Sequence, residues 1–537
     1  MSEQARKGIE EDTVALHEAP VNDALQVVGE PEGVPAPASP ADSRAARRAA
    51  RKAQKKDPTR LGRDSIGKLL VEFSIPGVIS MVFSSLYNLI DTAFLGQALP
   101  DGSGVAVTTL ALPVMTVLIA CSMIAGQGGN SLAAIQLGQG DKEQVERTLG
   151  NSAVLLFAIS AIVAVIAIVF IGPVLTVIGT PDILWDKTKT FVQITCIFFA
   201  FQSVGWGLSH FIRTAGRPVF SLMTSVIGTI MCIIFNYWFV LVLNWGVAGS
   251  AWANICGQAI GMVPVIWFFT ANKNTPFKLR WRCCKPNLRL MLKILTLGLA
   301  PFCMQVASTV VNIVFNQVAG YYGALSPIGV QGALASLGVA QKVSWFAFSP
   351  FIGLTMGAQP LFGFNYGASN WDRVLKTYKI TVITAVIMGT FWLIITRLFS
   401  NPIVVLFGVT GELEEFSNIA LLIYTVMFPL VGFQAVGSNY FQASGQPLKS
   451  AILVLTRQVI FLIPFYFIIP NLAIELFGVD GLYGVAACVP AADLCSVLVT
   501  AVFVVIELRK LLRWRKEGYI LPKIMPNSES EQEMAQS

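Results

Sequence analysis

The chain has 537 residues, of which 54% are hydrophobic and only 13% are charged, and its formal net charge is +7. Soluble proteins carry roughly 25% charged residues. The composition therefore excludes a string of soluble domains and predicts a chain that lies mostly within a lipid bilayer.

The first 62 residues are rich in Ala, Pro and Glu and then in Arg and Lys, without an apolar period. Such a segment cannot bury enough apolar surface to offset the entropy of folding. We therefore expect residues 1–62 to be a disordered cytoplasmic tail.

About twelve apolar runs follow, each close to or above the roughly 20 residues that a helix needs to cross the hydrocarbon core. They predict an all-α polytopic membrane protein with an N-terminal lobe over 63–271, a polar inter-lobe loop over 272–289, a C-terminal lobe over 290–512 and a cytoplasmic tail over 513–537. The expected helices of the first lobe are 68–93, 106–137, 148–172, 189–212, 218–243 and 247–270. Those of the second lobe are 290–320, 330–362, 374–399, 415–442, 449–470 and 480–510.

The two halves of the chain are related by an internal repeat. Gly216 and Gly445 are 445−216 = 229 residues apart, and the same offset relates Gly138 to Gly367. A duplication with so long a period, running through hydrophobic helices, predicts two six-helix lobes and the architecture of a secondary transporter. Each lobe crosses the membrane an even number of times. The two lobes should therefore have the same orientation and be related by an axis along the membrane normal.

Basic residues cluster on alternate connections between the apolar runs. By the positive-inside rule these connections, and both termini, face the cytoplasm. The basic connections are the stretch 44–56, the turn with Arg213 and Arg217, the loop 273–289, the turn with Arg373, Lys376 and Lys379, and the end 509–516.

A carboxylate near the outer end of the first helix is the first candidate site. Charged groups inside a membrane are costly to insert and are functional hypotheses by default. Asp91, beside Asn88, could take up a proton or coordinate a sodium ion with neighbouring oxygens. The alternative is an aspartate at a helix end that reaches interfacial water.

Three further embedded charges, Lys342, Arg457 and Asp493, belong to the second lobe. Counting residues at a rise of 1.5 Å places all three roughly 12–13 Å from the cytoplasmic side. We expect them to form a charged network that is private to this lobe. It could act as a gate or a second proton site, or it could be a static pair that fixes helix packing.

Pro76 interrupts the hydrogen-bond ladder of the first helix and is a hinge candidate, although such prolines are also ordinary packing features.

The cysteine spacings and the two histidines predict neither a metal site nor a disulfide. The segment GQGGN lacks the Lys and Ser/Thr of a phosphate loop. We therefore expect no enzymatic activity, no cofactor other than a coupling ion, and no nucleic-acid partner.

Several motifs together resemble the multidrug and toxic compound extrusion (MATE) transporters, most closely their bacterial branches. They are DTAFLG around Asp91, LGQGD at 137–141, RTAGRP at 213–218, WGVAGSAWAN at 245–254, GFNYGA at 363–368, FQASGQP at 441–447 and PAADL at 490–494. The resemblance runs from residue 69 to about residue 512. It implies a multi-pass protein of the inner membrane, commonly a monomer, that extrudes mostly cationic aromatic compounds in exchange for sodium ions or protons.

The resemblance also assigns roles to residues. Asp91 matches the family's first-helix carboxylate, which would make it the cation-coupling group. In the fifth helix, where many bacterial members carry Asn and then Asp four residues later, this chain has Cys232 and Asn236, and Asn254 stands where a sixth-helix Thr is common. Asn236 and Asn254 still offer amide oxygens, but the missing carboxylate favours proton coupling through Asp91 and leaves sodium open.

Two other functions stay open from the sequence. One is a flippase for a lipid-linked oligosaccharide or another anionic lipid, which would need a strongly basic cleft, whereas only Lys342 and Arg457 are embedded cations here. The other is a membrane receptor or scaffold, which no specific feature supports.

Overall fold

The computed structural model describes residues 58–98, 103–178, 180, 182–272, 275–406 and 411–523, all within one compact unit, Lys56–Ser537. Within the helices, the side chains of some positions, including 86–93, also lie outside the description. Of the predicted tail 1–62, only residues 58–62 are therefore described.

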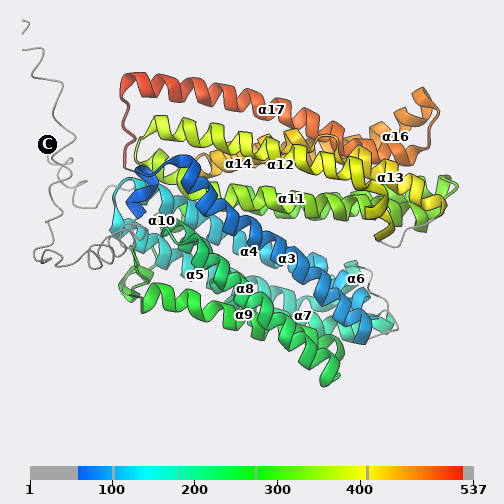
Figure 1. Ribbon diagram of the computed structural model, residues 1–537. Helices are drawn as coiled ribbons and strands as arrows, with labels where there is room; N and C mark the ends of the chain where they lie inside the picture. Colours follow the sequence, from blue (N-terminus) through cyan, green and yellow to red (C-terminus); the bar gives the residue numbers. More distant parts are fainter. Residues whose placement is uncertain are drawn as a thin grey trace, which may run out of the picture. The chain divides into compact units, whose positions relative to one another are not determined.

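The N-terminal lobe contains the expected six helices, most of them longer at their ends than the sequence predicts (Figure 1). Its elements are α3 (Ile66–Ala98), α4 (Ser103–Gly138), α5 (Lys142–Val169), the short α6 (Ile171–Ile178), α7 (Asp182–Thr214), α8 (Pro218–Asn236), the π-helical turn η3 (Tyr237–Val242) and α9 (Gly246–Thr270).

The C-terminal lobe follows a loop with the short 3-10 turn η4 (Trp281–Cys284). Its elements are α10 (Leu288–Leu325), α11 (Gly329–Gly367), α12 (Trp371–Leu406), α13 (Glu412–Thr425), α14 (Phe428–Ala443), α15 (Pro447–Leu455), the π-helical turn η5 (Thr456–Leu462), α16 (Ile463–Phe477) and α17 (Gly481–Glu517).

Two expected helices of this lobe are not regular. The predicted helix 415–442 is the pair α13 and α14, which are bent by 45° at their junction. Pro429 stands in the first turn of α14 and supplies no amide hydrogen to the ladder, so the chain bends there. The predicted helix 449–470 runs through α15, η5 and α16 to Phe477.

Ten helices of the described chain are long and apolar enough to cross a membrane, or eleven if the bent pair counts as one span. The 39-residue α11 is not among these eleven spans. Counting it as well gives 11 + 1 = 12 spans, the number that the sequence predicts. Nearly every residue of its second half is buried, including Gln359 and Asn365. A helix shielded from lipid can carry small and polar residues at its contacts, so hydropathy underestimates α11.

The two lobes pack against each other with the symmetry of the repeat. The first helix of each lobe contacts the second helix of the other, so that α3 lies on α11 and α10 lies on α4. At the centre, Asn130 donates from Nδ2 to Oε1 of Gln359 at 3.4 Å. These residues are 359−130 = 229 positions apart, which is the repeat offset. The pseudo-two-fold axis therefore passes between α4 and α11 at this bond.

Glycines permit these helices to cross with their backbones in contact. A Cβ on Gly298 of α10 would overlap the carbonyl group of Ile124 in α4, and a Cβ on Gly353 of α11 would overlap the backbone of Val78 in α3. Both crossings lie in the helix halves next to the same end of the bundle. In Figure 1, α3 and α11 meet at the left and separate toward the right.

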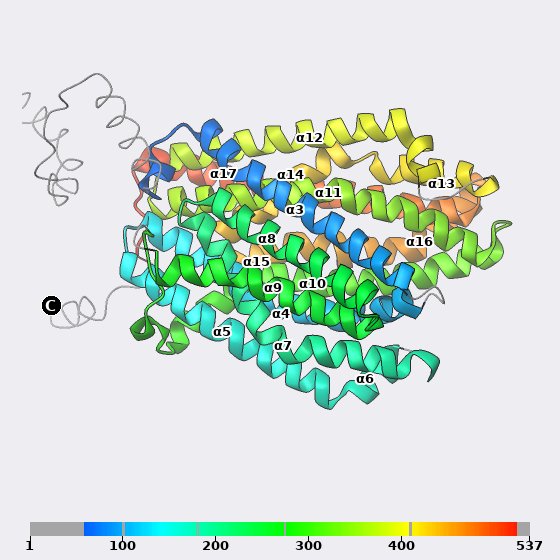
Figure 2. The same cartoon turned by 60° about the horizontal axis from the view of Figure 1, so that its bottom comes forward.

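We call the end at which both described termini lie the basic end. It contains η2 (Pro58–Gly62), the residues after α17, and the connections 139–141, 215–217, 271–287, 368–370 and 444–446. Figure 2 shows the same end at the left after rotation, with the start of α3 and the end of α17 close to the connections.

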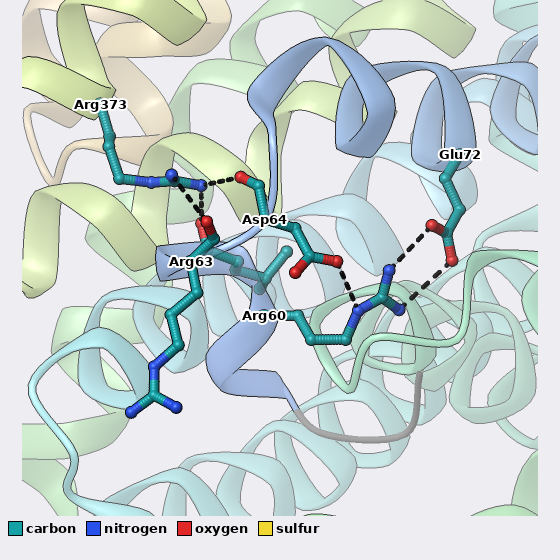
Figure 3. Close-up of polar contacts among 6 residues, drawn as sticks. Arg60, Arg63, Asp64, Glu72 and Arg373 are labelled. Carbon is teal, nitrogen blue, oxygen red and sulfur yellow. Dashed lines mark hydrogen bonds and ion pairs between the residues drawn. The ribbon is translucent and has the colours of Figure 1, made fainter. Parts of the chain in front are cut away.

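Residues 58–62, the last five of the predicted tail, are helical in the structure. They form η2, in which Leu61 is only 1% exposed within the core. Arg373 of α12 donates from Nη2 to the carbonyl oxygens of Leu61 at 2.9 Å and Asp64 at 2.7 Å (Figure 3). Asn365 of α11 donates to the same Leu61 oxygen at 3.1 Å.

Arg60 completes this contact from the N-terminal lobe. Its guanidinium pairs with Asp64 at 2.9 Å and with Glu72 at 3.0 Å (Figure 3). Burial lowers the pKa of Arg60, but its hydrogen bonds to Glu72 and Asp64 outweigh that effect and raise the pKa above its ordinary value. The segment that leads into α3 is thus clamped to the C-terminal lobe, and we call this set of contacts the clasp.

The described part of the inter-lobe loop is likewise held rather than free. Asn151 of α5 donates to the carbonyl oxygen of Cys283 at 3.3 Å and accepts from the amide of Asn287 at 2.9 Å. Glu146 accepts from the amide of Lys278 at 2.9 Å. Each lobe's first helix is therefore preceded by a segment that is anchored at the basic end.

The tail predicted from residue 513 begins as helix. The helix α17 continues to Glu517, and the ring of Trp514 stacks on that of Tyr519.

We predict that Gly298→Ala destabilises the protein, because the added methyl group has no space against α4. Overpacking at a well-packed contact costs about 1–3 kcal/mol. The apparent unfolding temperature in detergent should fall, whereas the control Gly338→Ala, with no atom near its Cβ position, should not lower it, because alanine is the better helix former. Equal temperatures for both variants would contradict the close crossing of α4 and α10.

We predict that Arg373→Gln releases the clasp. It removes the donor shared by two backbone carbonyl groups, a loss of about 1–3 kcal/mol in local stability. Hydrogen–deuterium exchange of the amides of 58–66 should become faster. The control Lys376→Gln changes an exposed cation one turn along α12 and should not alter exchange. Unchanged exchange in Arg373→Gln would show that the remaining contacts, including those of Asn365 and Arg60, hold η2 without Arg373.

Candidate functional site

The main candidate site is a pair of adjoining cavities in the C-terminal lobe, with volumes of about 110 Å³ and 180 Å³. We call them together the C-lobe cavity. Their walls share residues from α10, α11 and η5: Met304, Trp345, Phe348, Arg457 and Gln458. At one end, Met123 and Gln127 of α4 close the larger cavity, so the N-terminal lobe forms part of its wall.

Arg457 and Asp493 form an ion pair on the wall of this cavity. Nε of Arg457 donates to Oδ1 of Asp493 at 2.5 Å. The carboxylate side chain is 1% exposed and the arginine side chain is 25% exposed. The guanidinium also lies over the ring of Phe348, with its carbon 5.7 Å from the ring centroid. Both residues line the smaller cavity, and Oδ2 of Asp493 is buried there without a hydrogen-bond partner among the described residues.

Lys342 does not join this pair. Its side chain is exposed, and it makes no ion pair with any residue that the structure describes. The neighbouring Gln341 lines the cavity and donates to Asn312 at 2.8 Å. Adjacent helical residues point about 100° apart, so a residue at the right depth can still face the wrong way. The expected network thus consists of Arg457 and Asp493.

The C-lobe cavity is also lined by uncharged polar side chains that we did not predict from the sequence. Gln434, Ser438 and Gln442 are spaced by four residues on α14 and line the larger cavity. This spacing places them on one helix face, which is a signal that the sequence does contain. Three buried amide atoms here have no hydrogen-bond partner among the described residues, namely Asn439 Oδ1, Gln442 Nε2 and Gln458 Oε1.

A second polar site lies between α8 and α9 in the N-terminal lobe. Asn236 is fully buried, and its Nδ2 donates to the carbonyl oxygen of Cys232 at 3.1 Å. Its Oδ1 is buried without a partner in the described chain. The thiol of Cys232 contacts the carbonyl oxygen of Asn254 at 3.7 Å, and Gln258 reaches the same sulfur at 4.0 Å. Asn254 itself donates to the carbonyl oxygen of Ser250 at 3.1 Å.

The remaining predicted residues lie on α3, which packs against α8. Asn88 and Asp91 are helical, but their side chains lie outside the description, so their coupling role stays a prediction. Pro76 is buried beside the crossing of α3 and α11, and α3 continues through it as one helix. The structure shows its place at an inter-lobe contact, and its hinge role stays a prediction.

The chain matches the family model MatE over residues 76–238 and 301–468, which together make up more than half of it. It is 24% identical over 457 residues to the multidrug export protein MepA of Staphylococcus haemolyticus, covering 85% of this chain and 97% of the relative. It is 22% identical over 450 residues to MepA of Staphylococcus aureus, covering 84% and 96%.

Solved structures share the fold. One, described as the outward-facing conformation of a multidrug resistance MATE family transporter of the MOP superfamily, matches with a TM-score of 0.78 at 21% identity, covering 85% of this chain and 99% of that one. Another, a MOP superfamily transporter from Pyrococcus furiosus described as having a binding pocket of reverse polarity, matches with a TM-score of 0.77 at 21% identity, covering 85% and 98%. With its two matched repeats and its two-lobe helical fold, the chain belongs to the MatE family of transporters.

Proposed function

We propose that the protein is a secondary active antiporter that exports amphipathic, mainly cationic organic compounds in exchange for protons or sodium ions. The observation that carries this proposal is the C-lobe cavity, which is walled by α10, α11, α14 and η5 of one lobe and by α4 of the other. If the lobes rock against each other, one wall of the cavity moves away and the affinity for a bound compound changes. The names of the MepA relatives as multidrug export proteins support export.

The proposed orientation places the basic end in the cytoplasm, because it carries the clustered Lys and Arg residues of the connections. The lobes are in close contact at that end, so in the proposed orientation the described state would be closed to the cytoplasm. The protein would be a multi-pass protein of the inner membrane with both termini cytoplasmic, acting as a monomer.

The proposed coupling group is Asp91, supported by Asn88 and by the amides of Asn236 and Asn254. The buried, unpartnered Oδ1 of Asn236 favours this region, because an unsatisfied acceptor in an apolar helix bundle can accept from a proton donor or coordinate a cation. A site with a single carboxylate is a weaker sodium site than one with two, so we propose protons as the coupling ion. The flippase alternative is less well supported, because the cavity's arginine is already paired with Asp493.

We predict that the protein in liposomes moves a fluorescent cationic dye when a proton gradient is imposed, and that Asp91→Asn abolishes this flux. The amide cannot change its charge, so the two sides of the transport cycle lose their difference in affinity. The control Asp182→Asn alters an exposed carboxylate at the start of α7 and should retain the flux of the parent.

Two other results would change the proposal. Flux that follows a sodium gradient alone would contradict proton coupling and direct attention to Asn236 and Asn254. A folded protein that moves the dye under neither gradient would contradict drug antiport and favour the lipid flippase.

A further inference from the structure

The residues after α17 cross from one lobe to the other at the basic end. The helix ends at Glu517, and Gly518 takes a left-handed conformation with a φ of 61°, which turns the chain back over the end of the bundle. In Figure 1 this segment runs along the left edge, away from α17 and toward the N-terminal lobe. We call residues 518–522 the strap.

The first part of the strap is anchored on the C-terminal lobe. The ring of Tyr519 stacks on that of Trp514, with centroids 4.7 Å apart. The carbonyl oxygen of Tyr519 accepts from Nε1 of Trp371 at 2.8 Å, and the amide of Leu521 donates to Oγ of Ser369 at 2.8 Å. An aromatic stack and two partly buried hydrogen bonds therefore hold the strap to the start of α12 and to the turn before it.

The end of the strap reaches the N-terminal lobe. Nε2 of Gln139, in the turn after α4, donates to the carbonyl oxygen of Pro522 at 3.0 Å. This bond lies at an exposed position, where water competes for both groups, so it is weaker than the anchor on the other lobe. When the lobes separate at the basic end, the contact with Gln139 should break first.

The two turns that the strap binds are repeat copies of each other. Gly138 ends α4 and Gly367 ends α11, and 367−138 = 229 is the repeat offset. A Cβ on Gly138 would overlap the carbonyl oxygen of Phe364, and a Cβ on Gly367 would overlap that of Ile135. The two helix ends thus touch backbone to backbone, and the strap binds the turn that follows each of them.

The contacts of the strap leave no slack between these turns. Leu521 binds Ser369 and Pro522 binds Gln139, so adjacent residues hold opposite lobes. Consecutive Cα atoms are only about 3.8 Å apart, and the proline ring fixes its own φ at about −65°. A small separation of the turns must therefore break one of the two contacts, because the strap cannot extend.

We propose that the strap holds the basic end closed, and that it stays on the C-terminal lobe and releases Gln139 when the lobes part. This inference rests on the rocking motion of the proposed function and adds an element that sets the balance between its closed and open states. The strap complements the clasp. The clasp binds the segment before the N-terminal lobe to α11 and α12, whereas the strap binds the segment after the C-terminal lobe to the end of α4.

The test measures the separation of the lobes by double electron–electron resonance on the full chain in lipid nanodiscs. Spin labels replace Lys142 at the start of α5 and Lys376 in α12, two exposed residues at the basic end of opposite lobes. The labels are attached to non-natural amino acids, because the chain contains nine cysteines. The parent should show a short distance, the closed state, as its main population.

The first variants change the contact with the N-terminal lobe. In Gln139→Ala the ratio of closed to open molecules should fall about two- to tenfold, the effect of one net hydrogen bond. Gln139→Lys supplies a new donor to Pro522 and should keep the ratio of the parent. The matched control Gln331→Ala removes an exposed glutamine near the other end of α11 and should leave the ratio unchanged.

A further variant weakens the anchor on the C-terminal lobe. Tyr519→Ala removes the stack on Trp514 and should lower the same ratio. Because Tyr519 and Gln139 act through one strap, the double variant should lower the ratio no further than the stronger single variant does. Two residues that stabilise their own lobes independently would instead have effects that multiply.

Three results would overturn the proposal: an unchanged ratio in Gln139→Ala, an equal change in Gln331→Ala, or effects of Gln139→Ala and Tyr519→Ala that multiply. Dye flux is measured on the same variants, so the two proposals can fail separately. A ratio that responds to Gln139 and Tyr519 without dye flux under either gradient would contradict the antiport proposal alone. Flux in the parent, with a ratio that does not respond to Gln139, would contradict the role of the strap alone.

Discussion

The close crossing of helices from opposite lobes is the constraint on which the rest of the structure depends. At Gly298 against Ile124, and at Gly353 against Val78, two backbones touch with no side chain between them. In lipid, helices gain little from hiding apolar surface, so close van der Waals contact at small residues holds them together. These crossings close the basic end, and they bring α4 to the edge of the C-lobe cavity.

The crossings also explain where polar groups can be placed. Because α11 is enclosed by α3, α4 and other helices, it can carry Gln359 and Asn365 without exposing them to lipid. Gln359 meets its repeat partner Asn130 on the pseudo-two-fold axis, and Asn365 binds the segment that leads into α3. The polar contacts between the lobes therefore cluster at the same end as the glycine crossings. Separating the lobes there would break both sets together, which favours two discrete states over a gradual opening.

The two lobes repeat each other in backbone but differ in chemistry. The N-terminal lobe has uncharged amides and a thiol between α8 and α9, whereas the C-terminal lobe has an ion pair between η5 and α17. Burying a carboxylate is tolerated only when a partner offsets its desolvation, and here the partner is an arginine that keeps one edge in the cavity. The duplicated scaffold thus carries two polar sites of different chemistry.

Much of this arrangement could be predicted from the sequence, because it depends on residues counted along one helix. The offset of 229 residues is counted directly in the sequence. The length that a spanning run needs and the depths of Arg457 and Asp493 follow from a fixed rise per residue. The pairing of these two charges agrees with their shared depth. The role of Asp91 remains a prediction, since its side chain lies outside the description.

Only the tertiary structure decided which residues face one another. Lys342 has the depth of the pair but a different direction around α11, and direction depends on how a helix is rotated against its neighbours. Residues 58–62 look disordered by composition, yet Arg373, more than three hundred residues later, donates to the carbonyl oxygen of Leu61. The amides of α14 become a cavity wall only when α4, α10 and η5 pack around them. Depth is a property of a single segment, whereas contact depends on the packing of segments that are distant in the chain.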